Sequence, residues 1–423
     1  MKIFDAIKAS GYSKMEYLLV NYFWLNTISA ILGHVTGIGW FMGLLLPIII
    51  YSCLFSNKSY KRNDSILDMF WWFIFVWNVI SLLVIQYPHS GIMAIRCLTS
   101  QLAYMMVYWI VRKNPKVNIS AIITSAYWPF VIACILGIAF YINPPSWYVN
   151  ANVVSDTDNI TTFEELNALK FRSVFASAYN IAYFGAILII FEFFVLIRKN
   201  VENKRTHYAI SFLAIVSVFL TAMRAPVAAT LLGFVISLIY ANLYGGFKNI
   251  KSLSIVLGII SAVLIIIINQ MDSLTYDFFF MKYNSVFDSE SGYIQERLLH
   301  NQGQSTFSLF GDGVGRYNMY ADKYPPNFSK RDGEYLKLLL EQGYLGAFFN
   351  ILFWGSALLK SIFNFKDLKF EVCILIMLSV CMIGANPLST VDKYPFIFWM
   401  AVGQIANYRK YGKNKIVNSN SNV

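Results

Sequence analysis

Long apolar segments dominate this sequence and limit what it can fold into. Gly37–Phe55, Ile66–Ile85 and Leu253–Ile268 are each nearly free of charged side chains. A helix of about 20 such residues is long enough to cross the roughly 30 Å hydrocarbon core of a bilayer. Hydrophobic residues make up 57% of the chain and charged residues 13%, whereas soluble domains are about 45–50% apolar and about 25% charged. The sequence therefore predicts an all-α polytopic membrane protein.

Twelve segments have the length and apolar character of membrane-spanning helices. They cover residues 17–35, 37–55, 66–86, 91–111, 119–142, 173–197, 208–223, 227–244, 252–270, 336–360, 372–388 and 394–408. Residues 1–423 then form a single membrane domain, and Met1–Glu16 lacks the apolar core and cleavage site of a removable signal peptide. Residues 143–171 and 271–335 are long and polar, without an apolar periodicity of their own. We expect both to be extramembrane loops.

The distribution of basic residues predicts the orientation of the helices. If both termini are cytoplasmic, the inside segments contain 22 of the 34 basic and 8 of the 23 acidic residues, which leaves 12 basic and 15 acidic residues outside. The inside basic residues are Lys2, Lys8, Lys14, Lys58, Lys61, Arg62, Arg112, Lys113, Lys116, Arg198, Lys199, Lys204, Arg205, Lys248, Lys251, Lys360, Lys366, Lys369, Arg409, Lys410, Lys413 and Lys415. Cytoplasmic loops are enriched in lysine and arginine, so both long loops are expected outside. The net charge of +11 then reflects topology and contact with anionic membrane lipids, and does not indicate nucleic-acid binding.

Arginines near the outer ends of the expected helices are the first candidates for function. Arg224 lies between two predicted spans, Arg172 opens another, and Arg297 and Arg316 belong to the loop 271–335. A charge beside the hydrocarbon layer is costly and is by default a functional candidate, although Arg224 can instead anchor its helix by reaching toward the interface. Guanidinium groups bind phosphate oxygens in a bidentate manner. Together they predict a site for a diphosphate.

The same loop contains further polar residues at its end. It includes His300, a glycine-rich run Gly311-Asp312-Gly313-Val314-Gly315, and the segment Asp332-Gly333-Glu334-Tyr335-Leu336, which enters a helix containing Glu341. The glycine-rich run predicts either a turn that exposes amides to an anion or an ordinary loop turn. No metal or other cofactor is expected, because the four histidines lack metal-ligand spacing and the sequence has no Walker motif.

These segments resemble the O-antigen polymerase and ligase superfamily of bacterial membrane glycosyltransferases. That family typically has an arginine in its large outer loop, a Gly-x-Gly segment and a His-Asn-x-Tyr-Leu-x-x-Leu-x-Glu-x-Gly-x-x-Gly pattern entering a helix. The matching positions here are Tyr335, Leu336, Leu339, Glu341, Gly343 and Gly346. Asp332 and Gly333 stand where the family has His-Asn. Arg224 resembles the family's arginine between two helices, and Arg172 with Asn180 resembles the segment after its first long loop.

The resemblance implies a GT-C-like enzyme of the inner membrane that acts, on the periplasmic face, on glycans carried by undecaprenyl diphosphate. It also implies a flippase and a chain-length regulator as partners. We expect Arg224 and Arg297 to stabilise the departing diphosphate, with Arg172, Arg316 and His300 binding substrate. A carboxylate must accept the proton of the attacking sugar hydroxyl. Asp332 is the first candidate for this base, Glu334 and Glu341 are the alternatives, and Glu341 can instead serve to orient its helix.

Three functions remain open from the sequence. A polymerase joins lipid-linked repeat units, and a ligase transfers the finished glycan to lipid A–core. The aspartate at position 332 argues against the ligase, whose resemblance depends most on the histidine there. A flippase or other transporter also commonly has twelve helices, but it is expected to carry charges along a central cavity. Here the mid-membrane parts of the spans are almost free of acidic residues, and Glu192 lies near the inner end of its helix.

Overall fold

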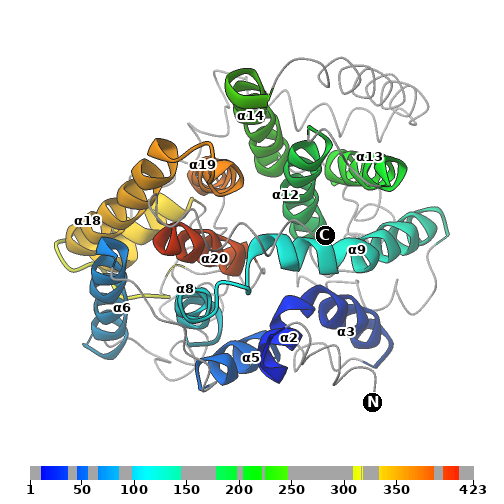
Figure 1. Ribbon diagram of the computed structural model, residues 1–423. Helices are drawn as coiled ribbons and strands as arrows, with labels where there is room; N and C mark the ends of the chain where they lie inside the picture. Colours follow the sequence, from blue (N-terminus) through cyan, green and yellow to red (C-terminus); the bar gives the residue numbers. More distant parts are fainter. Residues whose placement is uncertain are drawn as a thin grey trace, which may run out of the picture.

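The fold is helical throughout the part of the chain that the computed structural model describes (Figure 1). The described residues are 11–36, 45–55, 65–84, 98–143, 178–197, 203–221, 224–245, 308–315, 317, 333–384 and 394–408. Within these ranges every regular element is a helix and no residue belongs to a β-strand. The predicted all-α class is therefore confirmed for the described residues.

The helices coincide with the apolar segments of the sequence. In chain order they are α2 (Lys14–Val20), α3 (Tyr22–Thr36), α5 (Leu45–Leu54), α6 (Ile66–Val84), the π-helix η1 (Leu98–Leu102), α8 (Ala103–Lys113), α9 (Ile119–Ile142), α12 (Ala178–Leu196), α13 (Lys204–Leu220), α14 (Arg224–Tyr240), the π-helix η2 (Ala241–Gly245), α18 (Glu334–Phe363), α19 (Lys369–Gly384) and α20 (Tyr394–Asn407). Every predicted span except 252–270 overlaps one of these helices. Residues 252–270, 144–171 and 271–307 lie outside the described residues.

Length and composition allow three of the described helices to cross a membrane. They are Ile119–Phe140, Ala225–Tyr244 and Glu334–Phe363, whereas shorter apolar stretches of other described helices, such as Ile66–Leu82 and Ile181–Leu196, have 10–17 residues. On these three helices Trp128, Leu231 and Ile351 expose 69%, 61% and 65% of their surface. Large apolar side chains are stable in such positions when the surrounding medium is hydrocarbon. The described part of the chain thus has the character of a helical membrane protein.

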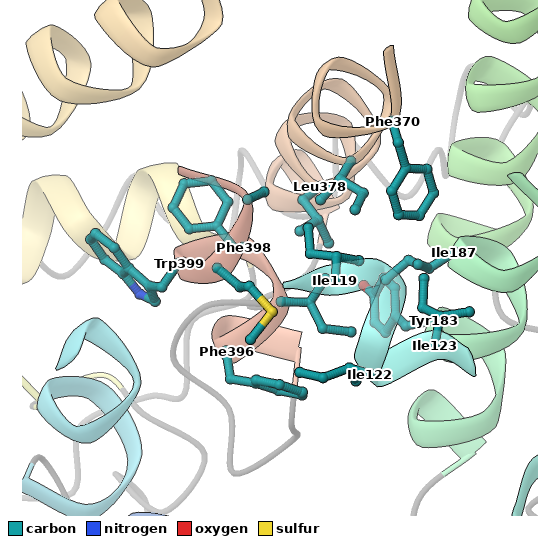
Figure 2. Packing of buried hydrophobic residues seen from close by; sticks show 14 of the residues in the cluster. Ile119, Ile122, Ile123, Tyr183, Ile187, Phe370, Leu378, Phe396, Phe398 and Trp399 are labelled. Carbon is teal, nitrogen blue, oxygen red and sulfur yellow. The ribbon is translucent and has the colours of Figure 1, made fainter. Parts of the chain in front are cut away.

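Aromatic and branched aliphatic side chains fill the centre of the bundle. Figure 2 shows Ile119, Ile122 and Ile123 of α9 packing toward Tyr183 and Ile187 of α12, with residues of α19 and α20 closing the cluster. The rings of Phe23 and Phe184 have centroids 4.1 Å apart. Two groups of hydrogen-bonded polar side chains interrupt this apolar core near the two ends of α6.

A buried ion pair joins α6, α8 and α20 at the beginning of α6. Arg112 donates from Nε to Oδ1 of Asp68 at 3.0 Å and from Nη2 to Oδ2 at 2.7 Å. Its Nη1 donates to Oδ1 of Asn407 at 2.5 Å, and the hydroxyl of Tyr108 donates to Asp68 at 2.5 Å. The charge of Arg112 is therefore neutralised within the protein. This bidentate arrangement fixes the relative positions of three helix ends.

Candidate functional site

The structure describes only some of the residues predicted to form the site. Glu334 and Glu341 are described in full, and Arg224 is the first residue of α14, with only its backbone described. The other candidates, Arg172, Arg297, His300, Arg316 and Asp332, lie outside the described residues. Described residues flank Arg316 and directly follow Asp332 in the sequence.

Helix α18 is broken at Gly343, where the sequence predicts one continuous helix. Gly343 has φ 68° and ψ −174°, a backbone conformation that only glycine readily adopts. The chain folds back at this point. The evidence is that the rings of Tyr335 and Trp354, on either side of the break, have centroids 5.8 Å apart. In a straight helix residues 19 positions apart would be separated by about 28 Å. In Figure 1 the yellow first part of α18 accordingly lies beside its orange second part.

The glycine-rich segment 308–315 packs against the break in α18 and forms hydrogen bonds with the backbone groups on both sides of it. The amides of Asp312 and Gly313 donate to the carbonyls of Leu340 and Glu341 at 2.8 and 3.0 Å. On the other side of the break, the amides of Tyr344 and Leu345 donate to the carbonyls of Ser308 and Leu309 at 3.1 and 3.2 Å. Four backbone hydrogen bonds thus replace those that the helix loses at Gly343.

Two glycines make this close approach possible. A Cβ atom added at Gly343 would lie 2.4 Å from the amide nitrogen of Gly311 and 2.4 Å from the carbonyl oxygen of Leu309. A Cβ atom added at Gly311, whose φ is 76°, would lie 2.4 Å from the amide nitrogen of Gly343. All three obstructing atoms belong to the backbone and cannot move without separating the two segments. The Gly-x-Gly segment and the Glu-x-Gly pattern noted in the sequence are therefore the two halves of one junction.

Helix α6 forms the third wall of the junction. Trp77 donates from Nε1 to the carbonyl of Gln342 at 3.0 Å, and Ser81 accepts the amide of Val314 at 3.1 Å. Asn78 accepts from the side chain of Gln342 at 3.0 Å. Sequence reasoning did not select these residues. Asn78 and Ser81 are polar residues three positions apart in an otherwise apolar helix. This spacing could have indicated a polar contact on one face of α6, and both side chains are buried.

The carboxylate of Glu341 accepts hydrogen bonds from backbone amides at the end of the glycine-rich segment. Its Oε1 accepts the amide of Tyr317 at 2.9 Å, and the carboxylate also accepts a hydrogen bond from the amide of Gly315. Lys337 supplies the counter-charge, with Nζ 3.8 Å from Oε1, and both side chains are 2% exposed. The two amides thus bind an anion, and that anion is the carboxylate of Glu341. Because Gly315 and Tyr317 flank Arg316, Glu341 fixes the backbone on both sides of that predicted substrate-binding residue.

The other described carboxylate candidate, Glu334, lies at the start of α18. It is 5% exposed and belongs to the first turn, following Gly333, which has φ 100° and caps the helix without a side-chain hydrogen bond. Asp332 directly precedes this glycine in the sequence. The beginning of α18 is therefore a buried helix terminus next to the predicted base.

The starts of three helices meet near the end of α19. The hydroxyl of Tyr335 at the start of α18 donates to the carbonyl of Ser379 at 3.1 Å. The thiol of Cys381, two positions further along α19, donates to the carbonyl of Ala225 at the start of α14 at 3.5 Å. The hydroxyl of Tyr183, in the second turn of α12, also contacts Cys381. Figure 1 shows α19 between α18 on one side and α12 and α14 on the other.

The meeting of these helix starts relates three candidate residues that are far apart in the sequence. Arg224 precedes Ala225, Asp332 lies three residues before Tyr335, and the segment from Arg172 leads into α12. Their chain neighbours therefore share one end of the bundle. Asp68 and Arg112 mark the opposite end, because Asp68 and Ser81 are 13 positions apart on α6, or about 20 Å.

No protein-family model matches the sequence, and no curated protein matches it.

Proposed function

We propose that this protein is a membrane glycosyltransferase that polymerises undecaprenyl-diphosphate-linked oligosaccharide repeat units into O-antigen or a related surface polysaccharide. The observation that carries the proposal is the meeting of the starts of α12, α14 and α18 beside Ser379 and Cys381. Each of these helices follows, in sequence, a residue for which the sequence suggests a role in glycosyl transfer: Arg172 six residues before α12, Arg224 at the start of α14 and Asp332 two residues before α18. A diphosphate and an acceptor sugar must be bound at the same place, and the helices that follow these three candidates in sequence meet at this end of the bundle.

The proposed reaction is one direct displacement. A hydroxyl of the acceptor sugar forms a bond to the anomeric carbon of the donor as the bond from that carbon to the lipid diphosphate breaks. The leaving diphosphate takes the electron pair, and Arg224 and Arg297 stabilise its charge where water is scarce. Asp332 takes the hydroxyl proton. A single displacement without a covalent enzyme intermediate inverts the configuration of the anomeric carbon.

The contacts of Glu341 favour Asp332 over Glu341 as the base. The carboxylate of Glu341 already accepts two amides and faces Lys337, and it is 2% exposed. A base must instead reach the proton that it removes. We therefore assign Glu341 the task of holding the segment around Arg316, and leave Glu334 as the second candidate for the base.

A transporter is the second candidate function, because broken helices are common at transporter binding sites. In such sites unwound carbonyls coordinate the transported ion. At the break of α18 the carbonyls of Leu340, Glu341 and Gln342 accept hydrogen bonds from Asp312, Gly313 and Trp77. These carbonyls are therefore already occupied by protein donors. This favours a role of the break in positioning the segment 308–315 over a role in ion binding.

The deciding experiment supplies purified protein with lipid-linked repeat units as the only substrate. A ladder of longer glycans on lipid is expected. If no ladder forms until lipid A–core is added, and the glycan then appears on that acceptor, the protein is a ligase. A transporter forms neither product and instead moves lipid-linked glycan across a vesicle membrane. The proposed partners, a flippase and a chain-length regulator, are not required for the ladder itself.

The proposed location is the bacterial inner membrane, with both termini cytoplasmic and the segment 271–335 periplasmic. Reporter fusions after Asn203 and after Asn284 should therefore report opposite compartments, cytoplasm for the first and periplasm for the second. The physical reason is the excess of basic residues in the inside segments. A pair of fusions that report the same compartment would refute this topology.

Arg297 should not tolerate replacement by lysine. The lysine ammonium lacks the planar fork of guanidinium, so Arg297→Lys should lose nearly as much polymerisation as Arg297→Ala, by roughly 10²–10³-fold. The measurement is glycan ladder formation at equal amounts of membrane protein. Arg205→Ala is the matched control, because Arg205 is exposed at the start of α13, and it should keep wild-type activity. Normal polymer from Arg297→Ala would exclude Arg297 from diphosphate binding.

A further inference from the structure

A buried carboxylate lies in α12, apart from the proposed catalytic site. Glu192 is the only charged residue of α12, and its side chain is 0% exposed. The residues next to it in sequence, Phe191, Phe193 and Phe194, are aromatic and contribute to the apolar core. A carboxylate in such surroundings is costly unless it is paired or protonated. Its partners therefore determine its charge state.

Glu192 contacts His207 and Tyr127, and one of its two oxygens has no hydrogen-bond partner among the described residues. Its Oε2 lies 2.6 Å from Nδ1 of His207, which belongs to the first turn of α13 and has a side chain 19% exposed. The hydroxyl of Tyr127 on α9 lies next to the same carboxylate, and the Tyr127 ring meets that of His207 edge-on at 6.2 Å. Within the described residues, Oε1 of Glu192 is buried and has no hydrogen-bond partner of acceptable geometry.

The charged groups on the neighbouring helices are directed elsewhere. On α13, Lys204 and Arg205 are exposed. On α19, Lys369 lies over the rings of Phe194 and Tyr240, and Glu371 accepts a hydrogen bond from Gln404. Helix α9 contains no charged residue. The charged residue of α14 is Arg224, at the start of the helix. Among the described residues, His207 is thus the basic side chain that Glu192 contacts.

We propose that Glu192 and His207 form a proton-binding site that is filled from the side of His207. One proton is shared between Nδ1 of His207 and Oε2 of Glu192. A second proton binds at Oε1 of Glu192, because that oxygen is buried and has no hydrogen-bond partner among the described residues, and a neutral carboxyl group loses less solvation than a carboxylate. The partly exposed imidazole connects the pair to water. Binding of the second proton adds one positive charge to the pair.

The occupancy of the site changes the contact between α9, α12 and α13. The ion pair of Glu192 and His207 holds α12 and α13 together by charge. With both protons bound, His207 carries its charge beside a neutral carboxyl group, and this attraction weakens. The inference is independent of the proposed enzyme activity, because it concerns a pair at some distance along α12 from the helix start that meets α19.

The test uses dicyclohexylcarbodiimide, an apolar reagent that reacts with protonated carboxyl groups buried in membranes. The carboxyl group adds across the carbodiimide and rearranges to an N-acylurea, which peptide mass spectrometry detects on Glu192. In purified wild-type protein, labelling of Glu192 should be high at acidic pH and fall as the pH rises. In His207→Gln the carboxylate loses its cation, so the labelling profile should move to higher pH by about one unit or more.

Two controls separate this result from non-specific labelling. Glu16 is 2% exposed, but its carboxylate accepts the amide of Ser13 at 2.6 Å in a capping box, so it should stay unlabelled. Ser211→Ala changes a residue one turn after His207 that bonds the His207 carbonyl and not Glu192, and it should leave the profile unchanged. Absence of labelling at Glu192 at every pH in both wild type and His207→Gln would overturn the proposal. An identical profile in the two proteins would overturn it as well.

Discussion

Asp332→Asn is expected to lower the rate of glycan polymerisation by roughly 10²–10⁴-fold, the range in which general bases contribute. Asparagine keeps the size and the hydrogen-bond acceptor of the side chain but cannot take the proton of the attacking hydroxyl. Binding of the lipid-linked donor should change little, because the diphosphate contacts arginines. The measurement is the initial rate of ladder formation with purified protein, together with the amount of protein in the membrane.

A matched substitution shows whether the effect belongs to position 332. Asp312→Asn also converts an aspartate to an asparagine, in the segment that docks on α18. Asp312 accepts the hydroxyl of Tyr317 at 2.5 Å, which an asparagine oxygen still accepts, so most of the activity should remain. If Asp332→Asn is active while Glu334→Gln is inactive, the base is Glu334 and our assignment within the site is wrong.

Gly343→Ala is expected to abolish most of the activity by opening the junction between α18 and the segment 308–315. Alanine at φ 68° and ψ −174° costs about 1–3 kcal/mol in backbone conformation alone. Its Cβ atom would also overlap the Gly311 amide and the Leu309 carbonyl, each at 2.4 Å. The segment that carries Arg316 must then move away, and a displacement of about 1 Å at a catalytic group can lower a rate by about 10²-fold.

Gly355→Ala is the control for this prediction, because it places the same side chain in the second part of α18. A Cβ atom added at Gly355 has nothing within 4 Å, and alanine favours the helix by about 1 kcal/mol over glycine. This variant should keep its activity and should not unfold at a lower temperature. Scanning fluorimetry in detergent and the ladder assay report the two properties.

The partner glycine gives a second check on the junction. Gly311→Ala should resemble Gly343→Ala, since its Cβ atom would lie 2.4 Å from the Gly343 amide. Because both changes open the same contact, the double variant should lose little more than either single variant. Additive losses would mean that the two glycines act separately and that the junction does not control the site.

Local sequence determined the helices and the identity of the candidate residues. Segment 119–142 is predicted and observed with the same limits, since an uninterrupted apolar run, an Asn118 cap and a following polar segment define it without reference to the rest of the chain. The segment 336–360 is also helical, but α18 begins two residues earlier and is broken at Gly343. A glycine in a helix is compatible with a continuous helix as well as with a break, so the sequence alone does not distinguish them.

Only the tertiary structure decided which residues meet. The break in α18 is stable because a segment more than 20 residues earlier supplies four backbone hydrogen bonds, and because Trp77 and Ser81 of α6 complete the pairing. The burial of Glu341 against two amides and Lys337 has the same origin. Composition and spacing specify what each segment can form by itself. The hydrogen-bond partners of a buried polar group come from segments distant in the chain, and they are fixed only when the helices pack.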